Sequence, residues 1–234
     1  MKGVRWSEKD KAFALSIFHA SPKAYRLLKK QFLLPSIKTL QRTVQNANIT
    51  PGFNNNILQA LSLKVKSLPP HSEACVLVFD EMAIKECVSY DSSRDRIEGL
   101  DDFGEGHKAS QHVANHATVF MVRGLMTNWK QPVGYFFSSG PMESGMLHLL
   151  LLECLEKLEE AGLDVKVVVA DQGSNNQRLF RYHLKATADE PFFLWKSKKI
   201  HVLPDPPHLL KNIRNNLKKT GFCCEWRICA MGAC

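Results

Sequence analysis

Two aspartates stand where runs of apolar residues, typical of buried strands, come to an end. Asp80 follows the run 76–79, Val-Leu-Val-Phe, and Asp171 follows the run 167–170, Val-Val-Val-Ala. The end of a strand holds the backbone of a residue rigidly. An acidic side chain there projects from the edge of the core towards solvent. If the two strands are parallel neighbours, their ends meet at one edge of the sheet. We therefore expect the two carboxylates to lie close together, although they are far apart along the chain.

Two clustered carboxylates repel each other unless a cation occupies the space between them. Hard oxygen ligands of this kind select Mg²⁺ or Mn²⁺. A pair of such ions can activate a water or a 3′-hydroxyl and stabilise the leaving oxygen in a phosphodiester displacement. Either aspartate alone is explained more simply as a cap or turn residue after a strand. Taken together, and in the strand order given next, they favour a metal site.

From residue 74 onward the pattern alternates between strands and helices. Apolar runs predict strands over 74–79, 117–122, 133–137, 165–170 and 200–203, and amphipathic patterns predict helices over 143–161, 174–185 and from 206 to about 219. A polar, glycine-containing stretch over 89–106 predicts a hairpin and a loop. The order of three strands, helix, strand, helix, strand and helix predicts an α/β fold, a mixed sheet flanked by helices.

The first third of the chain predicts short helices. Ser7 and Asp10 have the spacing of a capping box, and Ser21-Pro22 and Pro35-Ser36 each combine a capping serine with a proline that interrupts the preceding helix. A further helix is predicted over 54–66. The Pro69-Pro70 pair then marks the expected boundary with the α/β segment.

The positive charge is concentrated in these helices. Residues 1–70 hold twelve Lys and Arg against Glu8 and Asp10, a net charge of +10, whereas residues 71–234 hold 19 Lys and Arg against 21 Asp and Glu, a net charge of −2. A concentrated basic segment favours a polyanionic partner through phosphate neutralisation. Lysines that merely face solvent on helix surfaces would give the same net charge. Charge alone therefore does not distinguish a polyanion-binding segment from an ordinary exposed surface.

The third predicted helix carries side chains that reach phosphates and base edges. These are Lys38, Thr39, Gln41, Arg42 and Gln45. Three short helices with a basic, amide-rich last one are typical of a helix-turn-helix. A plain structural bundle has the same apolar spacing, and the pattern does not separate the two.

Several other classes of protein are disfavoured. No stretch approaches 18 consecutive apolar residues, and the N-terminus has no apolar signal core. We therefore expect no membrane association and a nuclear location. In such a compartment the seven cysteines stay reduced and do not form a disulfide framework.

Three motifs together resemble the P element transposase family, including its THAP-domain relatives in vertebrates. They are Val-Phe-Asp80-Glu-Met, Val-Ala-Asp171-Gln-Gly-Ser-Asn-Asn and Leu-Pro-Asp205-Pro-Pro-His208-Leu-Leu-Lys. The last is the most specific, because short strand-aspartate motifs occur in many folds. The block from Arg5 to about Asn46 is similar to the helix-turn-helix that precedes the catalytic core in that family. The resemblance extends from residue 5 to about residue 220.

This resemblance implies a helix-turn-helix module over 5–66 and an RNase H-like core over 72–205. Asp80 and Asp171 match the family's metal-binding aspartates, and transposon-end DNA would be held by the third-helix residues together with Arg5. Residues 206–220 would begin the family's GTP-binding insertion, after which a third acid, a glutamate, completes the metal site. On this interpretation the core is incomplete and C-terminally truncated, a zinc-binding THAP module would precede residue 1, and residues 221–234 form an unstructured, Cys-rich tail.

Some candidate residues have two interpretations. Asp205 either lies near the active-site edge or caps the next helix, and we favour the cap. Asn175 and Asn176 either bind phosphate at a helix start or cap that helix. His107, His112 and His116 match no metal-ligand spacing.

The tail cysteines, Cys223, Cys224, Cys229 and Cys234, do not fit a structural zinc site either. Glu225 lies in this same tail, outside the resemblance, and is not assigned the role of the third acid.

Two functions follow from these patterns. The first is a DNA transposase that cuts and joins phosphodiester bonds with Mg²⁺ or Mn²⁺. The alternative is a non-catalytic, transposase-derived protein that binds DNA, or that pairs with itself or with a full-length transposase. Without the third acid the geometry for in-line attack is incomplete, so this stretch of sequence predicts DNA binding with little or no strand cleavage.

Overall fold

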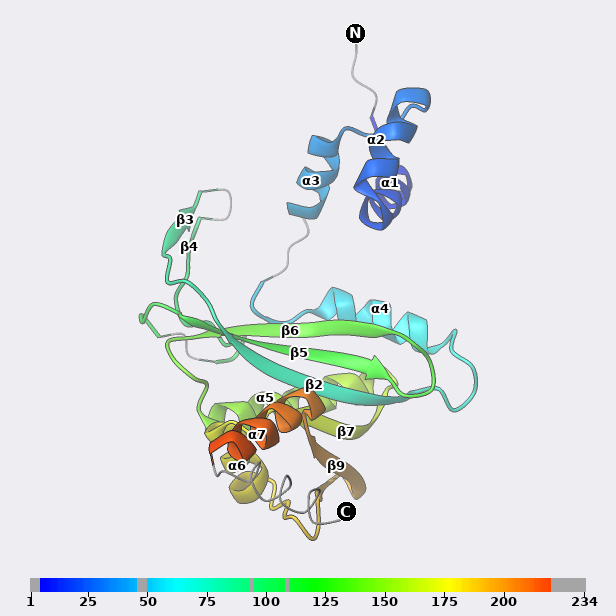
Figure 1. Cartoon of the computed structure of the whole chain (residues 1–234). Helices are drawn as coiled ribbons and strands as arrows, with labels where there is room; N and C mark the ends of the chain where they lie inside the picture. Colours follow the sequence, from blue (N-terminus) through cyan, green and yellow to red (C-terminus); the bar gives the residue numbers. More distant parts are fainter. Residues whose placement is uncertain (1–4, 46–49, 93–94, 108–109, 220–234) are drawn as a thin grey trace, which may run out of the picture. The chain divides into compact units, whose positions relative to one another are not determined.

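The computed structural model describes residues 5–45, 50–92, 95–107 and 110–219. The chain divides into two compact units, Met1–Ile49 and Thr50–Cys234 (Figure 1). The predicted tail over 221–234, with its four cysteines and Glu225, lies outside the described residues. Each unit has its own hydrophobic core and is described by itself.

The first unit consists of three helices whose starts match the capping signals. They are α1 (Glu8–Ala20), α2 (Pro22–Gln31) and α3 (Ile37–Gln45). The Ser7–Asp10 capping box is formed in both directions, and Ser21 Oγ accepts from the Ala24 amide. Ser36 Oγ accepts from the Thr39 amide at 3.0 Å. The three predicted helix starts are therefore confirmed.

A small core holds these three helices together. Its fully buried members are Ala14 of α1, Tyr25 of α2 and Leu40 of α3, and the Phe18 ring packs edge-on against Tyr25. The Tyr25 hydroxyl donates a buried hydrogen bond of 2.7 Å to the Pro35 carbonyl in the turn between α2 and α3. Burial raises the pKa of Tyr25, so it stays a neutral donor. This bond fixes the turn that orients α3.

Replacing Tyr25 with phenylalanine should loosen this unit. The change keeps the packed ring but leaves the buried Pro35 carbonyl without its donor, which costs about 1–2 kcal/mol. Hydrogen exchange in α1–α3, measured on the whole chain, should become faster. Tyr182→Phe, at an exposed ring of the second unit, is the matched control. Equal exchange in Tyr25→Phe and wild type would contradict a role for this bond.

The second unit is built on a seven-stranded mixed sheet in the order β1-β6-β5-β2-β7-β9-β8. Its strands are β1 (Gly52–Phe53), β2 (Ala74–Ala83), β5 (His116–Gly124), β6 (Lys130–Ser138), β7 (Asp164–Ala170), β8 (Phe192–Trp195) and β9 (Lys198–Pro204). Strands β3 (Ser89–Asp91) and β4 (Arg96–Glu98) form the hairpin expected within 89–106. Strands β2, β7 and β9 are parallel neighbours, whereas β5 and β6 run antiparallel to their neighbours. The predicted mixed sheet is confirmed.

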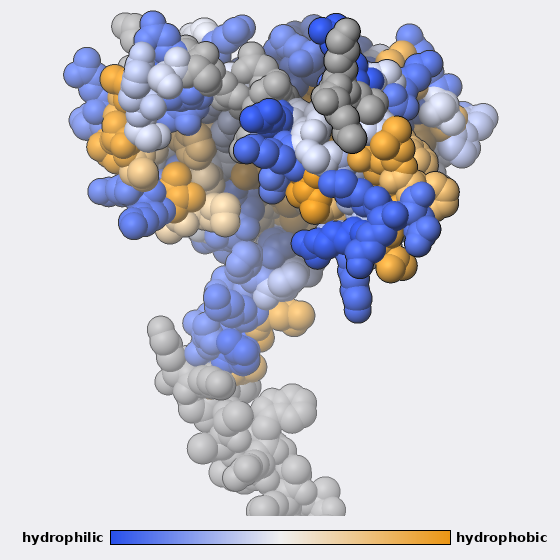
Figure 2. All heavy atoms as spheres, turned by 90° about the horizontal axis from the view of Figure 1, so that it is seen from above, coloured by the Kyte–Doolittle hydropathy of each residue, from blue (hydrophilic) through white to orange (hydrophobic). Residues whose placement is uncertain are grey.

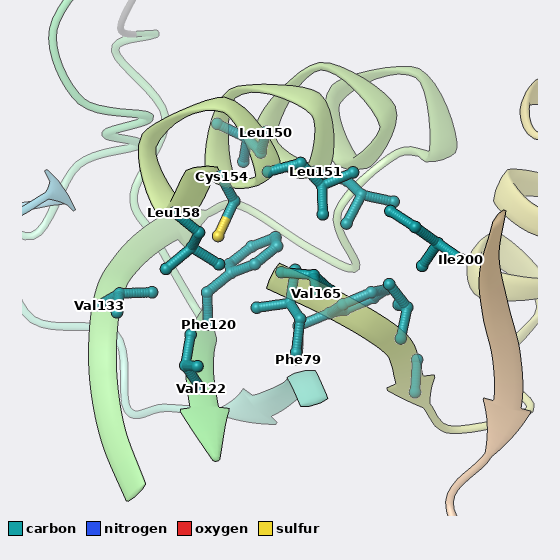
Figure 3. Packing of buried hydrophobic residues seen from close by; sticks show 14 of the residues in the cluster. Phe79, Phe120, Val122, Val133, Leu150, Leu151, Cys154, Leu158, Val165 and Ile200 are labelled. Carbon is teal, nitrogen blue, oxygen red and sulfur yellow. The ribbon is translucent and has the colours of Figure 1, made fainter. Parts of the chain in front are cut away.

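The core of this unit lies between the sheet and helix α5 (Ser144–Glu160). Figure 3 shows Leu150, Leu151, Cys154 and Leu158 of α5 facing the strands. Phe120 of β5 has no exposed surface and is ringed by other aromatic side chains of the core. The thiols of Cys75 and Cys154 are buried here, and burial raises the pKa of Cys75 to about 12. They act as small apolar side chains rather than reactive thiols.

Helix α4 (Asn55–Val65) belongs to the second unit, which corrects the boundary predicted at Pro69-Pro70. Its buried residues Leu58 and Leu61 join the same core as the leucines of α5. The apolar face of an amphipathic helix does not reveal what it packs against. The sequence therefore identified the helix correctly but assigned it to the helical module over 5–66, whereas the first compact unit ends at Ile49.

Two short strands were not predicted, and one predicted helix is not α-helical throughout. Neither β1 nor β8 was predicted. The helix predicted over 174–185 is α6 (Ser174–Arg178) continued by a π-helical turn η1 (Leu179–His183). The last helix, α7 (Pro206–Lys219), begins where it was predicted to begin and extends to the last described residue.

The surface shows no membrane-spanning feature in the described segments. No described helix is both long and apolar enough to cross a bilayer. Most of the face seen in Figure 2 is hydrophilic, with hydrophobic side chains interspersed.

Candidate functional site

The two predicted aspartates lie on neighbouring parallel strands. Strand β2 pairs with β7 in parallel, with Val78 opposite Val169. Two residues further on, this register brings Asp80 and Asp171 to the same level. Asp80 of β2 therefore lies beside the end of β7, after which Asp171 follows.

Asp80 lies on an exposed stretch of β2. Alternation along the strand buries Leu77 and Phe79 against the core, so Asp80 points to the opposite face. Its Oδ1 accepts a 2.9 Å hydrogen bond from the following amide, that of Glu81. The strand does not end here, which corrects the sequence interpretation: β2 continues to Ala83, because β5 still pairs with it after β7 has ended.

Asp171 is the first residue after β7 and is partly buried. Its Oδ1 accepts two hydrogen bonds, from the Gly173 amide at 2.9 Å and from Asn176 Nδ2 at 2.6 Å. Among the described residues no hydrogen bond to its Oδ2 is found, so this oxygen is free to bind a ligand.

Asp205 follows β9, the next parallel strand, and its amide donates to the Ala170 carbonyl at 2.8 Å. Its carboxylate caps α7, because Oδ2 accepts from the His208 amide at 3.2 Å and lies 2.8 Å from His208 Nδ1. The favoured capping interpretation is confirmed.

A cavity of about 260 Å³ opens beside Asp171 and contains polar side chains that sequence reasoning missed. Glu81 lines it, with Oε2 accepting from the Met142 amide at 2.8 Å and Oε1 lying 3.7 Å from His116 Nε2. Thr118, directly across from Glu81 on β5, also lines it with a buried hydroxyl that finds no hydrogen-bond partner among the described residues. Strand alternation beyond Phe79 could have predicted that Glu81 faces inward, but not its partners.

The candidate histidines separate rather than cluster. His107 pairs with Glu153 at 3.3 Å, His112 contacts Ser110, and His116 contacts Asn115 and Glu81. In the described part of the chain, no group of three His, Cys, Asp or Glu side chains could hold a metal.

The candidate DNA-binding residues lie on the surface of the first unit. Lys38, Gln41 and Arg42 share the exposed face of α3, opposite the buried Leu40, and Arg5 is also exposed. Thr39 is committed to the helix start, because its amide and hydroxyl both bond to Ser36 Oγ. Gln45 falls on the same helical face by spacing, but its side chain lies outside the described residues.

Comparisons with known proteins identify both units. Residues 1–42 match the family described as transposable element P transposase-like, HTH domain, and residues 49–183 match TNP-like, RNase H N-terminal domain. The chain is 28% identical to the human DNA transposase THAP9 over 229 residues, covering 90% of this chain and 25% of the relative. It is 31% identical to the Drosophila melanogaster transposable element P transposase over 217 residues, covering 91% and 26%. The chain thus spans about a quarter of the length of these relatives.

A solved structure agrees with the family matches. The Drosophila P element transposase strand transfer complex superimposes with a TM-score of 0.71 at 30% identity, covering 92% of this chain and 45% of that chain. Its similarity extends over both units of the present chain. The chain therefore belongs to the P element transposase-like family, with a helix-turn-helix domain followed by the N-terminal domain of an RNase H-like fold.

Proposed function

We propose that this chain contributes the DNA-binding helix-turn-helix and two metal-binding carboxylates of a P element-like DNA transposase. The observation that carries the proposal is the parallel pairing of β2 with β7, which brings Asp80 and Asp171 to one level on adjacent segments. The relatives named as DNA transposases, and the strand transfer complex, support the same reaction class.

The carboxylates of Asp80 and Asp171 suit a small hard cation. Mg²⁺ is typically held by one or two carboxylates and completes its coordination with water and substrate phosphates. Asp80 is exposed and Asp171 Oδ2 is not engaged by any described residue, so each can offer an oxygen. When bound there, Mg²⁺ or Mn²⁺ would activate an attacking oxygen and stabilise the leaving oxygen of a phosphodiester.

The protein would contribute by fixing the positions of these carboxylate oxygens. Asp80 is fixed by a strand paired on both sides up to Val78, and Asp171 is fixed by two hydrogen bonds to one of its oxygens. Such positioning lowers the barrier by removing the need to order the ligands during the reaction.

DNA would be held by the exposed face of α3. Lys38 and Arg42 suit phosphate oxygens, and Gln41 suits a base edge. Thr39 is a weaker candidate, because its hydroxyl already serves the helix cap. A chromosomal DNA partner in turn implies a nuclear location.

Binding of duplex DNA tests the first half of the proposal. Wild type should retard a duplex on gels, with an affinity that falls steeply as salt rises. The double variant Lys38→Gln/Arg42→Gln removes two phosphate contacts, so the slope of log affinity against log salt should become shallower by about 1.8.

The control removes two exposed lysines of the second unit, in Lys66→Gln/Lys85→Gln, and should leave the slope unchanged. Equal effects of both double variants would show that general surface charge, not α3, binds DNA. A chain that binds DNA through α3 but binds no divalent ion through Asp80 and Asp171 would favour the alternative, a non-catalytic DNA-binding or oligomerising protein.

A further inference from the structure

The loop after Asp171 contains a conspicuous pair of amides whose role the sequence left open. Asn175 and Asn176 begin the five-residue helix α6. Neither caps it, because Gly173 is the N-cap residue and no side chain makes a cap hydrogen bond. Asn176 is instead bonded to Asp171 in the preceding loop, and Asn175 to Met142 before α5.

Asn176 is directed at the candidate metal ligand. Its Nδ2 donates to Asp171 Oδ1 at 2.6 Å, and the Gly173 amide donates to the same oxygen at 2.9 Å. Two donors on one oxygen fix the rotation of the carboxylate and leave Oδ2 as its open ligand atom. A hydrogen bond to a charged acceptor is among the stronger kinds in proteins.

Gly173 leaves space for the carboxylate of Asp171. A Cβ atom built at Gly173 would lie 2.9 Å from Asp171 Oδ1, closer than real Cβ contacts are. A larger residue at Gly173 would therefore displace the carboxylate from the position in which it accepts from Asn176. The motif Asp-Gln-Gly-Ser-Asn-Asn thus has a glycine where the carboxylate needs space and an asparagine where the carboxylate accepts a hydrogen bond.

Asn175 ties the same loop to strand β2. Its Nδ2 donates to the Met142 carbonyl at 2.9 Å, and the Met142 amide donates to Glu81 Oε2 at 2.8 Å. Glu81 is the residue next to Asp80. A single backbone residue, Met142, thus bridges the segments that carry the two aspartates.

From these contacts we propose that Asn176 is a positioning residue for Asp171, and that the Glu81–Met142–Asn175 bridge holds the two aspartate-bearing segments in register. The inference rests on the proposed function, since it gives Asp171 the role of a divalent-cation ligand. Outer hydrogen-bond partners of metal ligands typically change metal affinity by about 10–100-fold when removed.

The first arm of the test needs no metal. In the metal-free chain, NMR should show an Asn176 side-chain amide that exchanges slowly with water and shifts when Asp171 is replaced by asparagine. An Asn176 amide that exchanges as fast as that of an exposed asparagine would overturn the proposal.

The second arm measures Mn²⁺ affinity by electron paramagnetic resonance. Asn176→Leu removes the donor at similar side-chain size and should weaken binding by about 10–100-fold. Gln177→Leu is the matched control, because Gln177 donates to the Gln172 carbonyl rather than to Asp171. In an Asp171→Asn background, Asn176→Leu should have no further effect, whereas general damage to the loop would add to the loss.

The outcomes distinguish a failure of the proposed metal site from a failure of the positioning role of Asn176. If Asp171→Asn does not change Mn²⁺ affinity, the proposed metal site fails and this inference fails with it. If Asp171→Asn weakens binding but Asn176→Leu leaves it unchanged, the metal site stands and only the positioning role is wrong.

Discussion

Replacing Asp171 with asparagine is expected to weaken Mn²⁺ or Mg²⁺ binding by more than about 100-fold, because loss of a direct ligand should exceed the 10–100-fold loss typical of an outer partner. Asp80→Asn should act similarly. The charge repulsion between the two carboxylates also disappears, so the metal-free Asp80→Asn variant should be no less stable than wild type. Titration calorimetry with Mn²⁺, together with thermal unfolding with and without the ion, measures both effects.

Asp205→Asn is the matched control for this prediction. Asp205 also follows a parallel strand at the same edge of the sheet, but its carboxylate is committed to the start of α7. Asparagine caps helices about as well as aspartate does, so stability and ion binding should both persist. Equal loss of binding in all three variants would mean that the general negative charge of this edge, and not a defined pair, attracts the ion.

Replacing Phe120 with alanine is expected to cost about 3–5 kcal/mol of stability in the second unit, the usual loss for a fully buried phenylalanine. Its ring has no exposed surface and lies 5.2–5.6 Å from the ring centres of Phe53, Phe79 and Phe136. Because Phe79 precedes Asp80, the cavity should also loosen the strand that carries this acid. The urea midpoint for exchange of the α5 and β5 amides, followed by mass spectrometry, measures the loss.

Phe13→Ala provides the comparison, since Phe13 is a phenylalanine of the first unit with 63% of its surface exposed. It should leave the α5 and β5 amides unaffected. A Phe120→Ala variant within about 1 kcal/mol of wild type would show that the aromatic cluster can collapse around the missing ring and is not the centre of this core.

Local signals determined most of the secondary structure. The Ser7–Asp10 capping box, the serines before α2 and α3, and the apolar runs of β2 and β7 all specify structure through neighbours within a few residues. The parallel pairing of β2 with β7 was also predictable, because strand order and burial leave few arrangements of such a chain. This pairing brings Asp80 level with Asp171, whereas the metal-binding role of the two aspartates stays a prediction.

Contacts between distant segments were beyond such signals. Helix α4 has the same amphipathic pattern whether it packs on α3 or beside α5, and only its contacts assign it to the second unit. Strand β8 is short and depends on pairing with β9 for its existence. Strand β2 continues past Asp80 because β5 supplies a partner there.

For the candidate site, the sequence by itself determined which two acids follow the buried apolar runs of β2 and β7, because such runs are a local property. Only the tertiary structure decided what surrounds them: Glu81 reaches Met142 across 61 positions of the chain, and Asn175 reaches the same residue across 33. Hydrogen bonds of this kind depend on how the β6–α5 connection and the α6 loop are folded together. The type of a residue determines whether its side chain can donate or accept a hydrogen bond, but the fold determines which partner it bonds to.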